Sequence, residues 1–295
     1  MANLKEVRNR IASVQSTQQI TKAMKMVSAA KLKRATNAII ALRPYATKLK
    51  EILENLSASL EGSSSPFIQE REPHKVLIVT VSSNRGLAGA FNMNVIKAAN
   101  NLIAEKYSEQ LKNGNVSIIS IGKKTQDFYE KRKYNVIGNN NEIYAALTFE
   151  NVTKVTDAIM AGFIKGDFDR VEVVYNRFRN AAIQYITTEQ LLPLPKAEEP
   201  VKENVKTTNV DYILEPSQEE IVEQLIPKSI KIQLYKAVLD SHASEHGARM
   251  TSMDKATENA GELLKALKLS YNQARQAAIT TELTEIVSGA AALNG

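Results

Sequence analysis

A heptad repeat in the first sixty residues constrains the fold of this chain more than any other feature. Its positions follow one another in steps of three and four residues. The seam consists of Leu4, Val7, Ile11, Val14, Gln18, Thr21, Lys25, Ser28, Leu32, Ala35, Ile39, Leu42, Ala46, Leu49, Leu53, Leu56 and Leu60. A repeat held over about eight heptads is typical of a coiled coil. At about 1.5 Å per residue the helix would be about 80 Å long, so it must leave any small core and pair with another helix.

The apolar pattern of this seam is interrupted between Gln18 and Ser28. In that stretch Ile20, Met24 and Val27 form a substitute apolar stripe, displaced by one residue toward the N-terminus. A displaced stripe predicts that the contact face slides around the helix. We therefore expect this stretch to contact a partner protein instead of the helix that pairs with the rest of the seam.

A second long helical stretch runs from Ser217 to Ala292. Ser217 and Glu220 fit a capping box, and Pro227 favours a start of the long helix at that proline, because the first turn tolerates proline. A second seam with three-four spacing follows. It consists of Ile232, Tyr235, Leu239, Met253, Ala256, Ala260, Leu263 and Leu267. The two ends of the chain are therefore candidate partners in one coiled coil.

The charges of the two ends also favour pairing. Residues 1–60 contain eleven Lys or Arg and three Glu, a net charge of +8. Residues 217–295 contain eight Lys or Arg and ten Asp or Glu, a net charge of −2. Two oppositely charged terminal helices around a compact middle region predict an antiparallel coiled coil, with residues 1–60 and 217–295 flanking a domain over residues 74–215.

The last part of the second helix has a pattern of its own. From Ala277 to Leu293 it is apolar on nearly every side, and only Glu282 and Glu285 carry charge. A helix with this pattern is usually buried all round. We expect it to extend past the first helix as a single helix enclosed by partner subunits, although a capping helix folded onto the middle domain is the alternative.

The middle region alternates strand and helix patterns. The β-branched content predicts strands at Val76–Val81, Val116–Ile121, Val136–Ile137 and Val171–Phe178, and the helical stretches are Phe91–Tyr107, Lys123–Lys133 and Val152–Lys165. This alternation indicates a mostly parallel, Rossmann-like α/β sheet. Two further strands, Ile183–Leu192 and Val210–Leu214, would form a hairpin around a loop over residues 195–209.

Composition excludes several classes of protein. The 295 residues are 43% hydrophobic and 24% charged, as in an ordinary folded protein. The net charge of +6 is smaller than that of the first helix alone, so the basicity is local. Without cysteine the chain has no disulfide or thiol chemistry. The apolar run Val76–Val81 is too short for a membrane span, and the N-terminus lacks a signal-peptide pattern, which predicts an intracellular chain.

Two turns of the α/β region invite a nucleotide-site interpretation. The turn Ser82–Gly89 carries glycines three residues apart, which does not fit the G-x-G-x-x-G pattern. The segment Gly122–Thr125 resembles the end of a phosphate-binding loop but lacks the upstream glycine. Both turns are better explained as tight strand-to-helix connections, and we expect no cofactor.

The pair His242 and His246 matches the H-x-x-E-H pattern of zinc proteases. A catalytic zinc needs a third ligand, and the remaining histidine, His74, is distant in sequence. Both histidines fall on the predicted seam of the second helix, where polar residues commonly set register. The preferred hypothesis is therefore a structural histidine pair without metal.

The basic first helix leaves three interpretations open. Its cations include Lys22, Lys25, Lys31, Lys33 and Arg34. As a nucleic-acid arm it would lack the aromatic residues that stack on bases. The same cations fit a solvated outer face or a surface that meets an acidic protein.

Both ends of the chain resemble one family. Arg10–Gln15 and Thr17–Val27 resemble the start of the γ subunit of F-type ATP synthases, and Ser244–Asp254 and Tyr271–Ile286 resemble its C-terminal signature. The turn ending in Arg85–Gly89 also resembles that family. Asn84 departs from the pattern, because the family usually has Asp there. The resemblance covers the whole chain.

The resemblance implies a central rotor shaft without catalytic, cofactor or metal residues. The coiled coil would stand inside a hexamer of α and β subunits, and the α/β domain would sit with the ε subunit on the membrane ring of c subunits. Proton flow would turn the shaft, which would drive the catalytic β subunits through ATP synthesis. The chain would lie at the cytoplasmic face of the bacterial inner membrane, as a peripheral component held by its partners.

The resemblance also implies contact residues at the two ends of the shaft. The expected rotor–stator contacts are Lys22, Met24, Lys25, Arg249, Arg275 and Gln276. The expected foot contacts with the c ring or ε are Arg85, Gly86, Leu87, Tyr212 and Glu215. Two other classes stay open on the residues alone: an α/β enzyme with a helical dimerisation arm, and a nucleic-acid-binding coiled coil, whose affinity would depend steeply on salt.

Overall fold

The computed structural model describes residues 4–57, 65–194 and 218–294. Its elements are, in order, α1 (Leu4–Ser57), β1 (Val76–Val81), α2 (Phe91–Lys106), α3 (Ser108–Lys112), β2 (Val116–Ile121), α4 (Lys123–Lys131), β3 (Asn135–Val136), the 3₁₀ helix η1 (Asn141–Tyr144), α5 (Phe149–Lys165), β4 (Arg170–Phe178), β5 (Gln184–Leu192) and α6 (Gln218–Asn294). The chain forms two compact units, Met1–Ala29 with Arg249–Gly295, and Ala30–Ala248. Both terminal helices contribute to both units.

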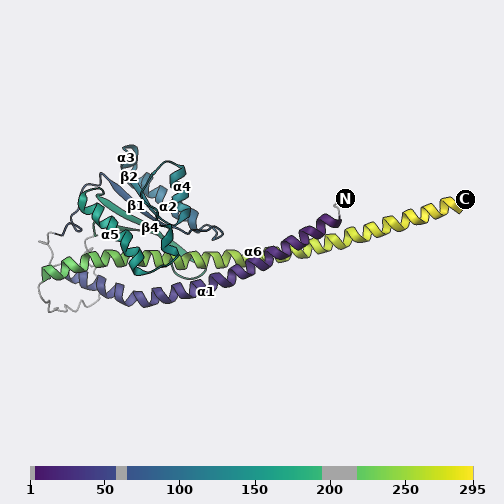
Figure 1. The fold of residues 1–295 in the computed structure, drawn as a ribbon, viewed down its shortest axis with the longest axis horizontal. Helices are drawn as coiled ribbons and strands as arrows, with labels where there is room; N and C mark the ends of the chain where they lie inside the picture. The colour runs from purple at the N-terminus through teal and green to yellow at the C-terminus, as the bar shows by residue number, and fades with distance from the viewer. Residues whose placement is uncertain (1–3, 58–64, 195–217, 295) are drawn as a thin grey trace, which may run out of the picture. The chain divides into compact units, whose positions relative to one another are not determined.

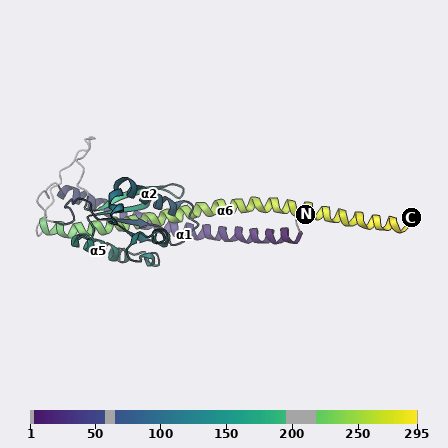
Figure 2. The ribbon, with the colours of Figure 1, turned by 90° about the horizontal axis from the view of Figure 1, so that it is seen from above.

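The first unit is an antiparallel helix pair (Figure 2). The Arg8 guanidinium donates to the Tyr271 hydroxyl at 2.8 Å, and farther along α1 the Lys25 ammonium lies 2.5 Å from Asp254. Residue numbers therefore rise along α1 as they fall along α6. All heptad positions from Leu4 to Ser28 are buried or half-buried, and between them Met24 of the substitute stripe is half-buried as well.

The predicted sliding of the α1 seam is wrong. Thr21 and Ser28 are 9% and 3% exposed, whereas Ile20 and Val27 of the substitute stripe are 59% and 57% exposed. The polar residues keep the seam because the facing part of α6 is also polar. We call this set the polar layer. It consists of Gln18, Thr21, Lys25 and Ser28 of α1 with Asp254, Thr257 and Gly261 of α6.

Two predictions for α6 also need correction. Leu264 is 8% exposed and occupies the seam, whereas the predicted Leu263 is 41% exposed. The seam follows Thr257 and Ala260 with regular spacing, which places Leu264 inward.

Pro227 lies inside α6 instead of starting it. Ile226 and Ile230 on either side are 1% and 0% exposed, and their burial compensates for the backbone hydrogen bond that proline cannot make.

The second unit is built on a five-stranded sheet with the order β3-β2-β1-β4-β5 (Figure 1). The first four strands are parallel, and β5 runs antiparallel to β4. This is the strand order of the Rossmann fold with its last strand reversed. The predicted fold class, a Rossmann-like α/β domain with long antiparallel terminal helices, is confirmed.

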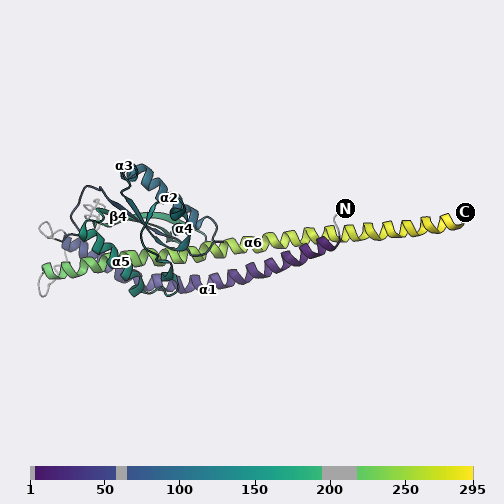
Figure 3. The same ribbon diagram turned by 45° about the horizontal axis from the view of Figure 1, so that its top comes forward.

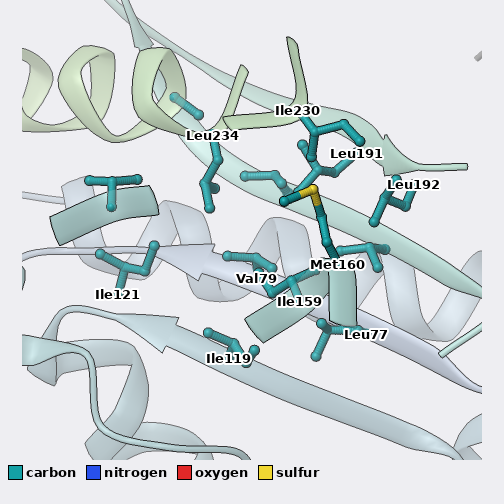
Figure 4. Packing of buried hydrophobic residues seen from close by; sticks show 14 of the residues in the cluster. Leu77, Val79, Ile119, Ile121, Ile159, Met160, Leu191, Leu192, Ile230 and Leu234 are labelled. Carbon is teal, nitrogen blue, oxygen red and sulfur yellow. The ribbon is translucent and has the colours of Figure 1, made fainter. Parts of the chain in front are cut away.

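Helices cover both faces of this sheet. Even-numbered residues of β1, Val76 and Ile78, pack against α2 and α4 on one face. Leu77, Val79 and Val81 point to the other face, where they meet α5 and the first part of α6. Figure 4 shows Met160 of α5 and Ile230 and Leu234 of α6 converging on this second face. The α6 helix is therefore part of the core of the domain as well as of the coiled coil.

The predicted strands and helices of the middle region lie close to the observed ones. α5 begins earlier than expected, because the Thr148 hydroxyl caps its start by accepting from the Asn151 amide. β4 and β5 pair as an antiparallel hairpin. The expected pairing of Ile183–Leu192 with Val210–Leu214 stays a prediction. The expected strand Val210–Leu214, the loop over 195–209 and the cap residue Ser217 lie outside the described residues.

Within the described parts of the chain, no helix has the length and apolar character needed to cross a membrane.

Candidate functional site

The six residues expected at the rotor–stator contact all lie in the first unit. Lys22 is exposed on α1, and Met24 is half-buried. Lys25 is half-buried in the polar layer and pairs with Asp254 at 2.5 Å. Because the side chains of this pair are 41% and 59% exposed, solvent screens their attraction. Of the two expected contact cations on α1, Lys22 is therefore the one that is exposed and Lys25 the one that pairs with α6.

On α6 the expected contacts differ in exposure. Arg249 is 7% exposed, so its guanidinium belongs to the interior. Arg275 and Gln276 are exposed on the outer side of the coiled coil, while the neighbouring Ala274 and Ala278 continue the seam. Arg275 and Gln276 are therefore accessible to a partner protein, whereas Arg249 acts from within the fold.

No described residue of the first unit covers the apolar end of α6. Its yellow end continues past the purple start of α1 (Figure 3). All described side chains from residue 279 to residue 291 are exposed. Ile279, Leu283, Ile286 and Val287 are between 49% and 67% exposed. An apolar surface of this kind marks an interaction site.

The expected foot residues Arg85, Gly86 and Leu87 lie in the second unit, on the loop over residues 82–90 that we call the foot loop. Arg85 and Leu87 are exposed, and Ala88 is 1% exposed and anchors the loop. The other two expected foot residues, Tyr212 and Glu215, lie outside the described residues.

The foot loop holds Leu87 in an unusual conformation. Leu87 has a φ of 64° and is 65% exposed. A residue with a large side chain is strained at a positive φ. Exposure of an apolar side chain to water costs further free energy. Backbone strain of this kind clusters at functional sites. Leu87 is therefore a candidate anchor for a partner.

Hydrogen bonds from within the protein occupy the start of α4, where Gly122–Thr125 resembles the end of a phosphate-binding loop. The amides of Lys123, Lys124 and Thr125 at the start of α4 donate to Asn84 Oδ1, to the Ser83 carbonyl and to Ser82 Oγ, at 3.0, 3.1 and 3.1 Å. A Cβ at Gly122 would lie 2.2 Å from the Ser82 carbonyl oxygen, so the two turns are in close contact. These amides are not available to an anion, which argues against a nucleotide here.

The departure at Asn84 has a structural consequence. Its side-chain oxygen accepts from Lys123, and its side-chain nitrogen donates to the Asn141 carbonyl at 2.8 Å. An aspartate would lack that donor. The amide therefore connects the foot loop to both α4 and η1.

The histidine pair packs against the α/β domain. His242 stacks on Tyr144 with ring centroids 5.7 Å apart, and the Nε2 atoms of His242 and His246 lie 3.1 Å apart. Among the described residues, no group of three or more His, Cys, Asp or Glu is placed to hold a metal ion.

Sequence reasoning missed the buried polar residues of α6. Asp240 is 3% exposed, and its Oδ1 atom has no hydrogen-bond partner among the described residues. Burial raises the pKa of Asp240 to about 6, although Lys236 and Arg43 act in the opposite direction. Ser241 and Ser244 are fully buried beside it. In the sequence, these three polar residues interrupt an apolar helical pattern, and that interruption could have indicated buried polar side chains.

Comparison with known proteins agrees with the resemblance in sequence. The ATP synthase family profile matches residues 3–293. The chain is 57% identical to the ATP synthase gamma chain of Cytophaga hutchinsonii, 56% to that of Flavobacterium psychrophilum and 46% to that of Geobacter metallireducens. In each comparison the match covers 100% of both chains.

Solved structures share the fold at lower identity. A rotor chain of the Euglena gracilis mitochondrial ATP synthase is similar with a TM-score of 0.66 at 22% identity, over 94% of this chain and 98% of that one. A chain of the Tetrahymena thermophila mitochondrial central stalk and c ring has a TM-score of 0.57 at 23% identity, over 80% of this chain and 99% of that one. The chain therefore belongs to the ATP synthase gamma chain family, the non-catalytic central-stalk, or rotor, subunits of F-type ATP synthase.

Proposed function

We propose that this chain transmits rotation between a proton-driven c ring and the catalytic β subunits of a bacterial ATP synthase. The observation that carries the proposal is the antiparallel pairing of α1 and α6 in the first unit, with α6 extending past α1. A shaft needs length and torsional stiffness, and two paired helices supply both. The shaft itself requires no catalytic residues.

The first unit is the part that turns inside the hexamer of α and β subunits. Exposed Lys22 and half-buried Met24 face the acidic levers of the β subunits, with Lys25 held in its pair with Asp254. Arg275 and Gln276 meet the hexamer near the upper end of the coiled coil. The apolar end of α6 turns in a sleeve of partner side chains, where an apolar surface avoids the strong charge pairs that would trap one angle.

The second unit carries the foot. The foot loop contacts the c ring or the ε subunit through Arg85, Gly86 and the exposed Leu87, and Tyr212 and Glu215 are expected in the same contact. Relatives support these partners: the Tetrahymena structure contains a central stalk with a c ring, and another Euglena gracilis structure contains the OSCP, F1 and the c ring. The chain is then peripheral, held at the cytoplasmic face of the inner membrane by its partners.

The absence of cysteine makes a direct test of rotation practical. The Arg85→Cys variant introduces a single thiol on the exposed foot loop, which can be biotinylated to carry a bead. In an immobilised complex of α, β and this chain, ATP should drive continuous rotation of the bead in one direction. A complex without ATP is the control, and a bead that stays fixed while the complex hydrolyses ATP would refute the proposal.

A further inference from the structure

Two buried serines connect α6 to the sheet of the second unit. The Ser241 hydroxyl donates to the Val81 carbonyl at 3.3 Å, and the Ser244 hydroxyl donates to the Asn176 carbonyl at 3.0 Å. Both serines are 0% exposed. Three residues apart, they lie on the same side of the helix. Alanine would favour the helix more than serine does, so the hydroxyls contribute through the carbonyls that they reach.

The two acceptor carbonyls lie where the β1–β4 ladder ends. The last paired residues of these strands are Thr80 and Val174. Val81 follows directly on β1, and Asn176 lies two residues farther along β4. The serines therefore bind α6 to both strands beyond the last β1–β4 pair, where Val81 still pairs with β2 and Asn176 with β5.

These contacts hold both ends of the foot loop. Val81, the acceptor for Ser241, is the residue immediately before the loop. Phe91, the residue immediately after it, accepts through its carbonyl from the Asn176 side-chain amide at 3.4 Å. Asn176 in turn accepts from Ser244. The loop thus begins and ends at residues that are connected to α6 by one or two hydrogen bonds.

The foot loop itself is internally braced. The Ser83 amide donates to Asn92 Oδ1 at 2.9 Å, and the Ser83 hydroxyl lies 2.6 Å from the Arg85 carbonyl. Asn84 ties the loop to α4 and η1. A force applied at exposed Leu87 would therefore reach Val81 and Phe91 through a stiff segment.

A second close contact lies one helical turn farther along α6. A Cβ at Gly247 would lie 3.1 Å from the carbonyl oxygen of Ala181 in the β4–β5 turn. The helix and the turn approach so closely that glycine is the residue that fits without displacement. This contact limits sliding of the helix along the sheet beside the two serines.

We infer that Ser241, Ser244 and Asn176 are positioning residues that make the foot loop and α6 turn as one body. We call this set the loop clamp. The inference rests on the proposed function, because it assigns the clamp to torque transfer from the foot contact into the shaft. The competing explanation is that these hydrogen bonds only stabilise the fold.

The test compares three variants of the complete ATP synthase in membrane vesicles. Ser241→Ala with Ser244→Ala removes the clamp hydroxyls. Thr156→Val removes a buried hydroxyl of α5 that bonds within its own helix, and it serves as the matched control for lost stability. Leu87→Asp perturbs the foot contact itself. Each complex is assayed for the rate of ATP hydrolysis and for ATP-driven proton pumping.

The clamp predicts that the double serine variant pumps about twofold fewer protons per ATP hydrolysed, whereas Thr156→Val leaves this ratio unchanged. An unchanged ratio in the serine variant, together with a reduced ratio for Leu87→Asp, would overturn the clamp and leave the foot contact standing. An unchanged ratio in both variants would overturn the foot contact and the clamp together. Equal reductions in the serine variant and in Thr156→Val would show a purely structural role.

Hydrogen exchange provides a second readout if the double variant does not assemble. In the full-length chain carrying Ser241→Ala alone, amides of the foot loop should exchange about fivefold faster, because one hydrogen bond that holds the start of the loop is lost. Amides in β2, remote from the clamp, should be unaffected. Unchanged exchange in the loop would contradict the inference.

Discussion

The hydroxyl oxygens of Thr21 and Thr257 lie 2.8 Å apart across the two helices of the first unit. They form the centre of the polar layer, where the Gln18 side chain also reaches the Thr257 carbonyl at 3.4 Å. Polar positions in a coiled-coil seam commonly fix register at some cost in stability. The polar layer therefore fixes how α1 and α6 are aligned, which a shaft needs more than maximal stability.

Replacing both threonines by valine should make the chain as stable as the unaltered chain or more stable, because the two polar groups are removed together. Each single replacement should lower the free energy of unfolding by about 1 kcal/mol, since it leaves one hydroxyl facing a methyl group. Thermal melts of the four chains give the coupling energy between the two sites. Strictly additive effects would contradict direct coupling.

Met24→Glu should reduce ATP-driven proton pumping of the assembled complex more than ATP hydrolysis. The Met24 side chain is half-buried and lies outside the heptad positions, so a negative charge there would repel acidic partner residues without occupying a seam position of the coiled coil. Met24→Leu conserves volume and is the matched control. If both activities decline in proportion to the yield of complex, the role of Met24 is structural.

The sheet could be predicted from the sequence because its strands are short and apolar. Val76–Val81 and Val116–Ile121 were predicted with the observed bounds, since both are buried almost throughout. Their order and the reversal of β5 depend on long-range pairing, which local pattern does not encode. The sequence pattern accordingly did not indicate that β4 and β5 pair.

The coiled coil was predicted in kind but not in detail. A single helix cannot reveal that Lys25 faces Asp254, because the complementary residue lies more than two hundred positions away. The apolar pattern alone therefore favoured Ile20 and Val27 for the seam. The loop clamp was missed for the same reason, since the acceptors of Ser241 and Ser244 are backbone carbonyls, which have no signature in sequence.

Asp240→Asn should stabilise the chain at high pH. Unfolded Asp240 loses its proton near pH 3.8, and the folded residue, whose pKa burial raises, loses it near pH 6. Between these values the folded state binds more protons, so the free energy of unfolding falls as pH rises from about 4 to about 6. The difference between the two pKa values corresponds to about 3 kcal/mol. The asparagine side chain of the variant does not ionise, so the variant does not lose this stability as the pH rises.

The measurement for Asp240→Asn is a series of denaturant titrations between pH 4 and pH 8. We expect the variant to be more stable than the unaltered chain at pH 8 and to converge with it near pH 4. Glu258→Gln, at an exposed position of the same helix, is the control. If the variant gained the same free energy of unfolding at pH 4 and at pH 8, ionisation of Asp240 would be excluded as the cause of that gain.

Removing residues 288–295 should leave the melting temperature of the isolated chain almost unchanged and weaken assembly or torque of the complex. The described side chains of this segment are exposed, as are Ile286 and Val287 just before it. Deletion therefore exposes little new apolar surface in the isolated chain, whereas a partner sleeve would lose the contacts that enclose the helix. Leu264→Ala is the contrasting control, because it truncates a seam residue that is 8% exposed and should destabilise the isolated chain by about 2 kcal/mol or more. If the truncated chain instead melted far below the unaltered one, the end of α6 would be buried within this chain and the sleeve would be rejected.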